Sequence, residues 1–134
     1  MNPDHKIKPG ASRSEIFTVE ERHTALHIGS GKVGVLATPW MIAFMEINTR
    51  KMLDELLPEG YTTVGTHVDV SHRAPAALGS QVSAYGEVQT VDGKRITLAV
   101  KVTQGDTTIG EGRHQRYIID SGRFLQRLEG KASP

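Results

Sequence analysis

Residues 38–60 read TPWMIAFMEINTRKMLDELLPEG, and residues 61–72 read YTTVGTHVDVSH. The first stretch predicts a helix that begins at its Thr-Pro pair and ends near Leu57, where a proline and a glycine stop it. In the second stretch the apolar period falls from about 3.6 residues to 2, which predicts a strand. The chain therefore combines one long helix with a sheet.

Alternating apolar residues continue the sheet beyond this point. They predict three further strands, over 81–88, 95–102 and 107–119. Before the helix, residues 15–26 predict another strand and the glycine-rich residues 27–32 predict a loop. A long helix and a mostly antiparallel sheet have one economical arrangement, in which the sheet curls around the helix.

The length of 134 residues fits a single domain with one core. We expect this domain over residues 15–128, because residues 1–14 and 129–134 are polar and predict flexible tails. Hydrophobic residues make up 37% of the chain and charged residues 23%, which is typical of a folded domain and not of a disordered chain or a membrane protein.

Charge and composition exclude several classes of function. The 16 Lys and Arg residues against 15 Asp and Glu residues leave a net charge of +1, so we expect neither a nucleic acid nor a membrane as a partner. The absence of cysteine excludes thiolate metal sites and cysteine nucleophiles, and the absence of a GxSxG motif disfavours a serine hydrolase. The opening residues, MNPDHKIKPGASRSE, lack the apolar segment of a secretory signal, so we expect a cytoplasmic protein.

The remaining histidines and cations offer no clear site. The histidines lack metal-ligand spacing, so we expect no metal. Several cations in or beside the predicted strands are expected on the surface, where some could bind the phosphates of a large anionic ligand: Arg73, Arg95, Lys101, Arg113 and Arg116.

Alternation sorts the strand at 61–72 into two faces. Even positions share one face and odd positions the other: Val64, Val68, Val70 and His72 against Thr63, Gly65, His67 and Asp69. A long sheet in a small domain leaves exposed edges, so we expect a homodimer, with assembly beyond a dimer left open.

Glu46 directly follows the apolar run WMIAFM, residues 40–45, in the part of the helix that should be enclosed. An ionised carboxylate there is costly unless a donor or a cation pairs with it, and such a group suits a general base. The alternative is an ordinary solvent-facing acid that pairs with Arg50 one turn further on.

Thr38 and His72 are the other candidate site residues. Thr38 lies at the helix start, where free N–H groups suit a developing oxyanion, although helix capping alone also explains it. His72 ends its strand and is either a hydrogen-bonded residue at the rim of the core or a group that handles a proton near Glu46. Thr38 and Glu46 are eight residues apart. That spacing is about 12 Å along a helix, so the two would flank a substrate instead of touching.

Together, TPWMIAFMEINTR and LPEGYTTVGTHVDVSH resemble the hot-dog-fold acyl-CoA thioesterases, in particular the group typified by fluoroacetyl-CoA thioesterase. The resemblance rests on the Thr-Pro helix start, the glutamate that follows it, the LPEG helix exit, the TVGT strand and the VDVSH strand end, and it extends to about Tyr117. It implies an α+β hot-dog fold, in which a curved and mostly antiparallel sheet of about five strands wraps a long central helix.

The resemblance also implies a reaction, the hydrolysis of an acyl-CoA with a short or small acyl group to the free acid and coenzyme A. The family's threonine, glutamate and histidine fall on Thr38, Glu46 and His72. Its glycine that approaches the acyl group across the dimer interface falls on Gly65. Glu46 would act on the carbonyl carbon directly or through a water, while Thr38 polarises the thioester and His72 manages protons. Acyl-CoA is thus the expected partner, with coenzyme A as part of the substrate and no separate cofactor.

The resemblance leaves the acyl group unassigned and has two alternatives, a binding protein and a hydratase. The group has an aromatic lid before the threonine, whereas HIGSGKVGVLA, residues 27–37, contains no phenylalanine, so we assign no fluoroacetyl selectivity. A hot-dog fold can also serve a non-catalytic protein that binds an acyl-CoA or a small acyl ligand. A hydratase is disfavoured, because the expected Asp-His pair is missing and His27 has only glutamates as acidic neighbours.

Overall fold

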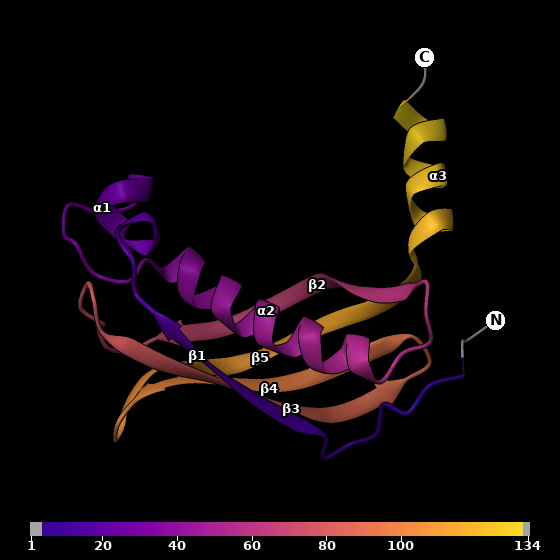
Figure 1. Ribbon diagram of the computed structural model, residues 1–134, viewed down its shortest axis with the longest axis horizontal. Helices are drawn as coiled ribbons and strands as arrows, with labels where there is room; N and C mark the ends of the chain where they lie inside the picture. Colours follow the sequence, from indigo (N-terminus) through magenta and orange to yellow (C-terminus); the bar gives the residue numbers. More distant parts are fainter. Residues whose placement is uncertain (1–3, 133–134) are drawn as a thin grey trace.

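The computed structural model describes residues 4–132 and consists of a five-stranded sheet curled around one long helix (Figure 1). The elements, in chain order, are β1 (Ser12–Thr18), the 3-10 helix η1 (Glu21–His23), α1 (Ala25–Ile28), α2 (Thr38–Glu55), β2 (Tyr61–His72), β3 (Gln81–Asp92), β4 (Arg95–Gln104), β5 (Thr107–Asp120) and α3 (Ser121–Ala132). The predicted α+β class is confirmed, and so is the order of a strand, a long helix and four more strands.

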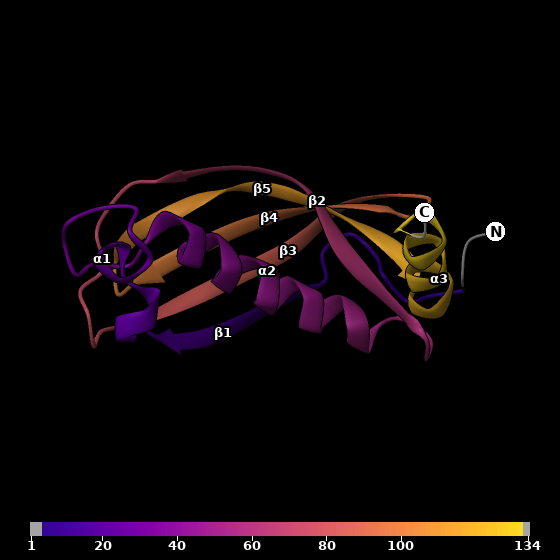
Figure 2. The same ribbon diagram turned by 90° about the horizontal axis from the view of Figure 1, so that it is seen from above.

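The sheet has the strand order β1-β3-β4-β5-β2, and every pair of neighbours is antiparallel. α2 lies along the concave face of this sheet (Figure 2). Apolar side chains of α2 meet the inward-facing residues of the strands in one core, which includes Met41, Phe44, Met45, Leu53, Val82, Ile96, Leu98 and Ile118. The alternation of the strands thus has the core on one side and solvent on the other.

β2 contains a bulge that the simple alternation did not predict. In the register with β5, Gly65 pairs with Arg116 and His67 pairs with Gln115, so Thr66 is an extra residue. A bulge of this kind reverses which face the following side chains take. Before the bulge the odd position Thr63 is buried and Val64 lies opposite the exposed Tyr117, whereas after it the even position Val68 lies opposite the buried His114. The assignment of all even positions of this strand to one face is wrong for this physical reason.

The first part of the chain also differs from the prediction. Ile7 is buried in the core, and β1 begins at Ser12, so the body includes much of the predicted 1–14 tail. The predicted strand over 15–26 is wrong beyond Thr18, because Thr24 accepts a hydrogen bond from the His27 amide and starts α1.

The last part of the chain forms a helix. α3 occupies residues 121–132, where the sequence predicts the end of the domain at 128 and a tail from 129. Residues 1–3 and 133–134 of the two predicted tails lie outside the described residues. None of the helices within 4–132 is long and apolar enough to cross a membrane.

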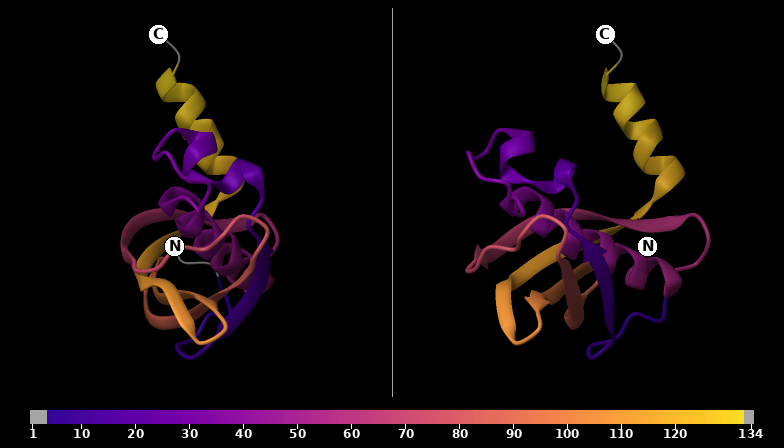
Figure 3. Two further views of the ribbon diagram at one scale, coloured as in Figure 1. Left: turned by 90° about the vertical axis from the view of Figure 1, so that its left-hand side faces the viewer. Right: turned by 60° about the vertical axis from the view of Figure 1, so that its left-hand side comes forward.

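Two segments rise from the body on the same side (Figure 3). One is residues 25–35, which contain α1 and a glycine-rich turn, and which we call the α1 loop. The other is α3, at the opposite end of the molecule. β2 runs between them as an edge strand of the sheet.

Candidate active site

Thr38 and His72 form a hydrogen-bonded pair where α2 begins and β2 ends. Ala37 is the N-cap of α2 and makes no side-chain capping bond, so Thr38 is the first helical residue. Its Oγ1 lies 2.7 Å from Nδ1 of His72. The predicted capping role of Thr38 is therefore wrong, because its hydroxyl bonds the imidazole instead of a helix amide.

The other ring nitrogen of His72 is available for a ligand. Nε2 is buried and has no hydrogen-bond partner among residues 4–132. A buried polar atom without a partner is uncommon in a finished core, and it marks a position where a water or a substrate atom fits. His72 also lines an open hollow with Val35, Arg73, Ala74 and Pro75.

Glu46 belongs to a second cluster, further along α2. Its Oε2 lies 3.1 Å from Nη1 of Arg116, whose side chain is 6% exposed, while that of Glu46 is 36% exposed. Arg50, the alternative partner, pairs with Asp54 at 2.9 Å. Glu46 is thus a partly exposed carboxylate that pairs with the buried Arg116 and not with Arg50.

Arg116 is fixed by β2 as well as by Glu46. Its Nε donates to Oγ1 of Thr63 at 2.7 Å, and its Nη2 donates to the Thr63 carbonyl at 3.0 Å. Burial lowers the pKa of Arg116, and the Glu46 carboxylate opposes that shift. The guanidinium therefore presents a fixed N–H to one oxygen of Glu46 and leaves the other oxygen free for chemistry.

Gly65 explains how the carboxylate reaches this position. A Cβ built on Gly65 would overlap Oε2 of Glu46 and would lie 3.5 Å from Nη1 of Arg116. Only glycine leaves room for the ion pair to lie flat against β2. The bulge at Thr66 directly follows, so the strand is locally reshaped where the carboxylate meets it.

The structure thus places the four predicted residues in two pairs. Thr38 and His72 are in contact, and Glu46 and Gly65 are in contact. Along α2 the two pairs are separated by about 12 Å, the rise of eight helical residues. We call the first the hydroxyl–imidazole pair, and we call Glu46, Gly65, Arg116 and Thr63 the carboxylate cluster.

Arg116 is the site residue that the sequence did not predict. It was expected among the surface cations, but it is 5% exposed. Its position in the alternation of β5 indicates its burial. Arg116 lies two residues from His114 and from Ile118, so all three side chains share the inner face, and all three are buried. A buried cation on the inner face of a sheet requires a buried or half-buried anion, and Glu46 provides it.

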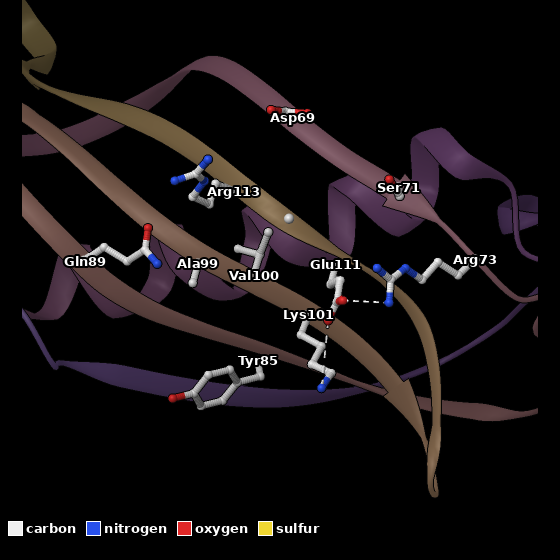
Figure 4. Close-up of a pocket in the computed structure, with 11 residues that line it drawn as sticks. Asp69, Ser71, Arg73, Tyr85, Gln89, Ala99, Val100, Lys101, Glu111 and Arg113 are labelled. Carbon is white, nitrogen blue, oxygen red and sulfur yellow. Dashed lines mark ion pairs between the residues drawn. The ribbon is translucent and has the colours of Figure 1, made fainter.

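The region around Glu46 is hollowed but open. A cavity of about 270 Å³ is lined by Ala43, Glu46, Ile47, Arg50 and Arg116. A larger hollow, of about 620 Å³, lies on the outer face of the sheet, away from α2 (Figure 4). There Glu111 pairs with Arg73 at 2.7 Å and with Lys101 at 3.9 Å. Because these cations are already paired, we place the candidate site at Glu46 and not in the larger hollow.

A buried histidine supports the helix segment that carries Glu46. Nε2 of His114 lies 3.0 Å from Oγ1 of Thr49, and the same hydroxyl donates to the carbonyls of Met45 and Glu46. Burial lowers the pKa of His114 to about 4, and the charge of Arg116 adds to this effect. His114 is therefore neutral at physiological pH and acts as a packing residue beneath the cluster.

The described side chains contain no group of three or more His, Cys, Asp or Glu residues that could hold a metal ion. The functional groups that the site presents are a carboxylate, a hydroxyl, an imidazole and a buried guanidinium.

Comparison with known proteins gives a consistent result. The family model described as "FlK: Fluoroacetyl-CoA-specific thioesterase" matches residues 19–122. A fluoroacetyl-CoA thioesterase from Streptantibioticus cattleyicolor is 30% identical over 97 residues, which are 72% of this chain and 70% of that protein.

Solved structures agree with the sequence comparison. The fluoroacetyl-CoA thioesterase FlK is 25% identical, with a TM-score of 0.88 over 96% of this chain and 99% of that chain. A thioesterase superfamily member from Thermus thermophilus is 27% identical, with a TM-score of 0.83 over 94% of this chain and 96% of that chain. A hot-dog-like protein from Thermanaerovibrio acidaminovorans, 24% identical, has a TM-score of 0.88 over 96% of this chain and 95% of that chain. The predicted hot-dog fold is confirmed.

Proposed function

The chain belongs to the family of fluoroacetyl-CoA-specific thioesterases and is an acyl-CoA thioesterase, and from this premise we propose that Glu46, Thr38 and His72 carry out the hydrolysis. The observation that carries the proposal is the Glu46 carboxylate, which Arg116 holds at 3.1 Å while the side chain stays 36% exposed. A carboxylate that is fixed and still accessible suits attack on a thioester or on a water.

Two routes of hydrolysis are open to Glu46, one as a general base and one as a nucleophile. As a general base it takes a proton from water, the hydroxide adds to the thioester carbonyl, and collapse of the tetrahedral intermediate breaks the C–S bond. As a nucleophile its oxygen adds to the carbonyl carbon and expels the coenzyme A thiolate, and water then cleaves the mixed anhydride. In either route the thiolate takes up a proton, and the products are the free acid and coenzyme A.

The hydroxyl–imidazole pair supports this reaction from the start of α2. The Thr38 hydroxyl and the positive end of the helix orient and polarise the thioester. Thr38 and His72 share the 2.7 Å hydrogen bond, and the unpartnered Nε2 of His72 is the position for a water or the proton that the thiolate accepts. The substrate and its water span the distance between the two groups.

Gly65 and the second copy of the chain belong to the same proposal. β2 is an edge strand, and residues 65–69 are exposed in succession. A second β2 that adds antiparallel to this edge would satisfy its free backbone groups in a homodimer. The Gly65 backbone then faces the acyl group across the interface. The cytoplasmic location expected from the sequence stays a prediction, which cell fractionation can test.

The test is thiol release from a panel of short, branched, aromatic and fluorinated acyl-CoAs. Wild type should release coenzyme A from at least one of them, and Glu46→Gln should lower kcat by about 10³-fold or more, because the amide is neither base nor nucleophile. Glu55→Gln is the matched control, since it makes the same change at an exposed position of α2 and should behave as wild type.

Two outcomes would contradict the proposal. Near-normal turnover by a folded Glu46→Gln variant removes the carboxylate from the chemistry. If wild type releases no coenzyme A from any acyl-CoA of the panel, the protein is better explained as a binding protein. The next experiment is then a search for its ligand. The order of kcat/KM among the acyl-CoAs of the panel identifies the preferred acyl group.

A further inference from the structure

α3 is a short helix that stands away from the body (Figure 3), and two of its apolar side chains are exposed. It has 12 residues, a length that is marginal for a helix in water unless something packs on it. Leu125 and Leu128 are 57% and 50% exposed, and a spacing of three residues puts them on one side of the helix. This side of α3 therefore requires a partner surface.

The α1 loop carries a second uncovered apolar surface. Leu26 is 59% exposed and Val33 is 64% exposed, and the two are joined by the hydrogen bond from the Leu26 amide to the Val33 carbonyl. The loop continues through Leu36 and Ala37 directly into Thr38. Val35, the last residue of the loop, lines the same hollow as His72, so a surface that packs on the α1 loop lies beside the hydroxyl–imidazole pair.

The two uncovered surfaces lie at opposite ends of the same edge strand. The α1 loop stands beside the end of β2 at His72, where the Val35–Ala77 bridge and the hollow beneath it are found. α3 begins at the other end, because Asp120 pairs with Tyr61. Both segments project past β2 on the same side, so β2 lies between two projecting segments (Figure 1, Figure 3).

A second copy on this edge brings the two surfaces together. Antiparallel pairing of two identical edge strands requires a two-fold axis through their midpoint, normal to the sheet. β2 has 12 residues, so its midpoint lies between Thr66 and His67, within the exposed run 65–69. Tyr61 then lies opposite the partner's His72, and α3 rises beside the α1 loop of the second copy.

We propose that α3 of each copy packs across the α1 loop of the other copy and completes the wall of its active site at the hydroxyl–imidazole pair. The inference rests on the homodimer and the site of the proposed function. Leu125 and Leu128 are its contact residues on α3, and Leu26 and Val33 are those on the α1 loop. The acyl-CoA must then enter beside a helix that belongs to the second copy.

Cross-linking between single cysteines tests this contact, because the chain has no cysteine of its own. Leu125→Cys and Leu26→Cys are placed in separately tagged chains, mixed through dissociation and reassociation, and treated with a short bismaleimide. The expected result is a covalent heterodimer that carries both tags. Ile16→Cys on β1, exposed and at the far edge of the sheet, is the control for Leu26→Cys and should give none with Leu125→Cys.

A kinetic measurement follows the consequence for the site. The double variant Leu125→Glu with Leu128→Glu should keep the dimer that β2 forms and should raise KM for acyl-CoA several-fold. Gln126→Glu adds a charge to the same helix next to these positions and should leave KM unchanged. Light scattering on both variants separates an altered site from a lost dimer.

The outcomes distinguish the proposals from one another. A wild-type chain that is monomeric by light scattering overturns the homodimer and this inference together, while thiol release still tests the chemistry. A wild-type dimer in which the Leu125→Cys and Leu26→Cys pair gives no more covalent heterodimer than the Ile16→Cys control overturns this inference alone. An unchanged KM in the folded, dimeric double variant removes α3 from the site.

Discussion

The carboxylate cluster and the hydroxyl–imidazole pair lie on the same helix but are built in different ways. Glu46 is held by a guanidinium that makes two further bonds to Thr63, and a glycine leaves it room. Thr38 is exposed, and its hydroxyl bonds His72, whose second ring nitrogen has no partner within residues 4–132. The carboxylate cluster thus contains an ion pair with a buried cation, whereas the hydroxyl–imidazole pair contains a single hydrogen bond.

This difference assigns different tasks to the two regions. A carboxylate held on one oxygen by a guanidinium that is itself fixed can apply its other oxygen at a defined place, which favours attack on a carbonyl carbon. A group with an unused hydrogen-bonding atom can bind a water or a substrate atom. Variants in the cluster should therefore mainly lower kcat, whereas variants in the pair should have smaller effects.

Among variants that leave Glu46, Thr38 and His72 unchanged, Gly65→Ala should have the largest effect. The new Cβ overlaps the Glu46 carboxylate and lies 3.5 Å from the Arg116 guanidinium, so the carboxylate must move. Displacing a reacting group by about 1 Å costs on the order of 10²-fold in rate, and we expect kcat to fall by about that factor or more. Steady-state kinetics at saturating acyl-CoA measures this loss.

Gly86→Ala is the matched control for that variant. Its Cβ would lie 2.5 Å from Cγ2 of Thr49 and 3.5 Å from Nδ2 of Asn48, so it also presses on α2 but not on the carboxylate. It should lower the melting temperature and keep kcat within a few-fold. Equal loss of kcat in both variants would show that any pressure on α2 inactivates the enzyme, and the special place of Gly65 would be lost.

Arg116→Lys should have the next effect. Lysine keeps the positive charge but lacks the planar fork that joins Glu46 to both polar groups of Thr63. We expect kcat to fall about 30-fold, and the free energy of unfolding to fall by about 2 kcal/mol because buried Thr63 atoms lose their partner. Arg113→Lys, an exposed position of the same strand, is the control. Unchanged kcat with lowered stability would make Arg116 a structural residue only.

Thr38→Val tests the hydroxyl–imidazole pair and should cost less. It removes the 2.7 Å hydrogen bond to His72, and we expect kcat to fall about tenfold, as for the loss of one orienting hydrogen bond. Stability should hardly change, because Thr38 makes no capping bond at the start of α2. Thr38→Ser restores the hydroxyl and should recover most of the rate. A loss of melting temperature typical of a removed helix cap would contradict this account.

Much of this architecture follows from the sequence. The long helix, the change of period at Tyr61 and the order of the strands are local patterns, and local patterns survive in the fold. The candidate residues Thr38, Glu46, Gly65 and His72 were also selected from the sequence, although their roles stay predictions. The sequence gives the spacing of these residues along the chain but not their contacts in the fold.

Contacts that depend on tertiary geometry were not predictable. The bulge at Thr66 reverses the parity of β2, and nothing in TTVGTHVDV marks it before β5 is paired. The partner of Glu46 is Arg116, which is 70 residues away in the chain, whereas helical spacing favoured Arg50. Likewise, Thr38 took His72 as its hydrogen-bond partner in place of a helix amide. Local sequence favours Arg50 as the partner of Glu46 and a helix amide as the partner of Thr38. The packing of β2 and β5 around α2 brings Arg116 and His72 into contact instead.

The smallest effect is the response of the carboxylate cluster to pH through the histidine beneath it. The pKa of His114 is lowered to about 4, whereas an unfolded histidine titrates near 6.5, so between these values the unfolded chain binds a proton that the folded chain does not. Stability is therefore fully present above about pH 6.5 and falls as the pH is lowered toward 4. The expected slope is about 1 kcal/mol for each pH unit.

Urea unfolding from pH 7 to 4.5 measures this slope, and His114→Gln should flatten it, because glutamine does not titrate and can still bond Thr49. Burial also lowers the pKa of His23, so a part of the slope with the same sign should persist in the variant. If His114→Gln leaves the slope intact, another group dominates the acid sensitivity and His114 does not connect pH to the cluster. If His114→Gln flattens the slope while Thr38→Val leaves it unchanged, His114 is the group through which acid destabilises the fold beneath the carboxylate cluster.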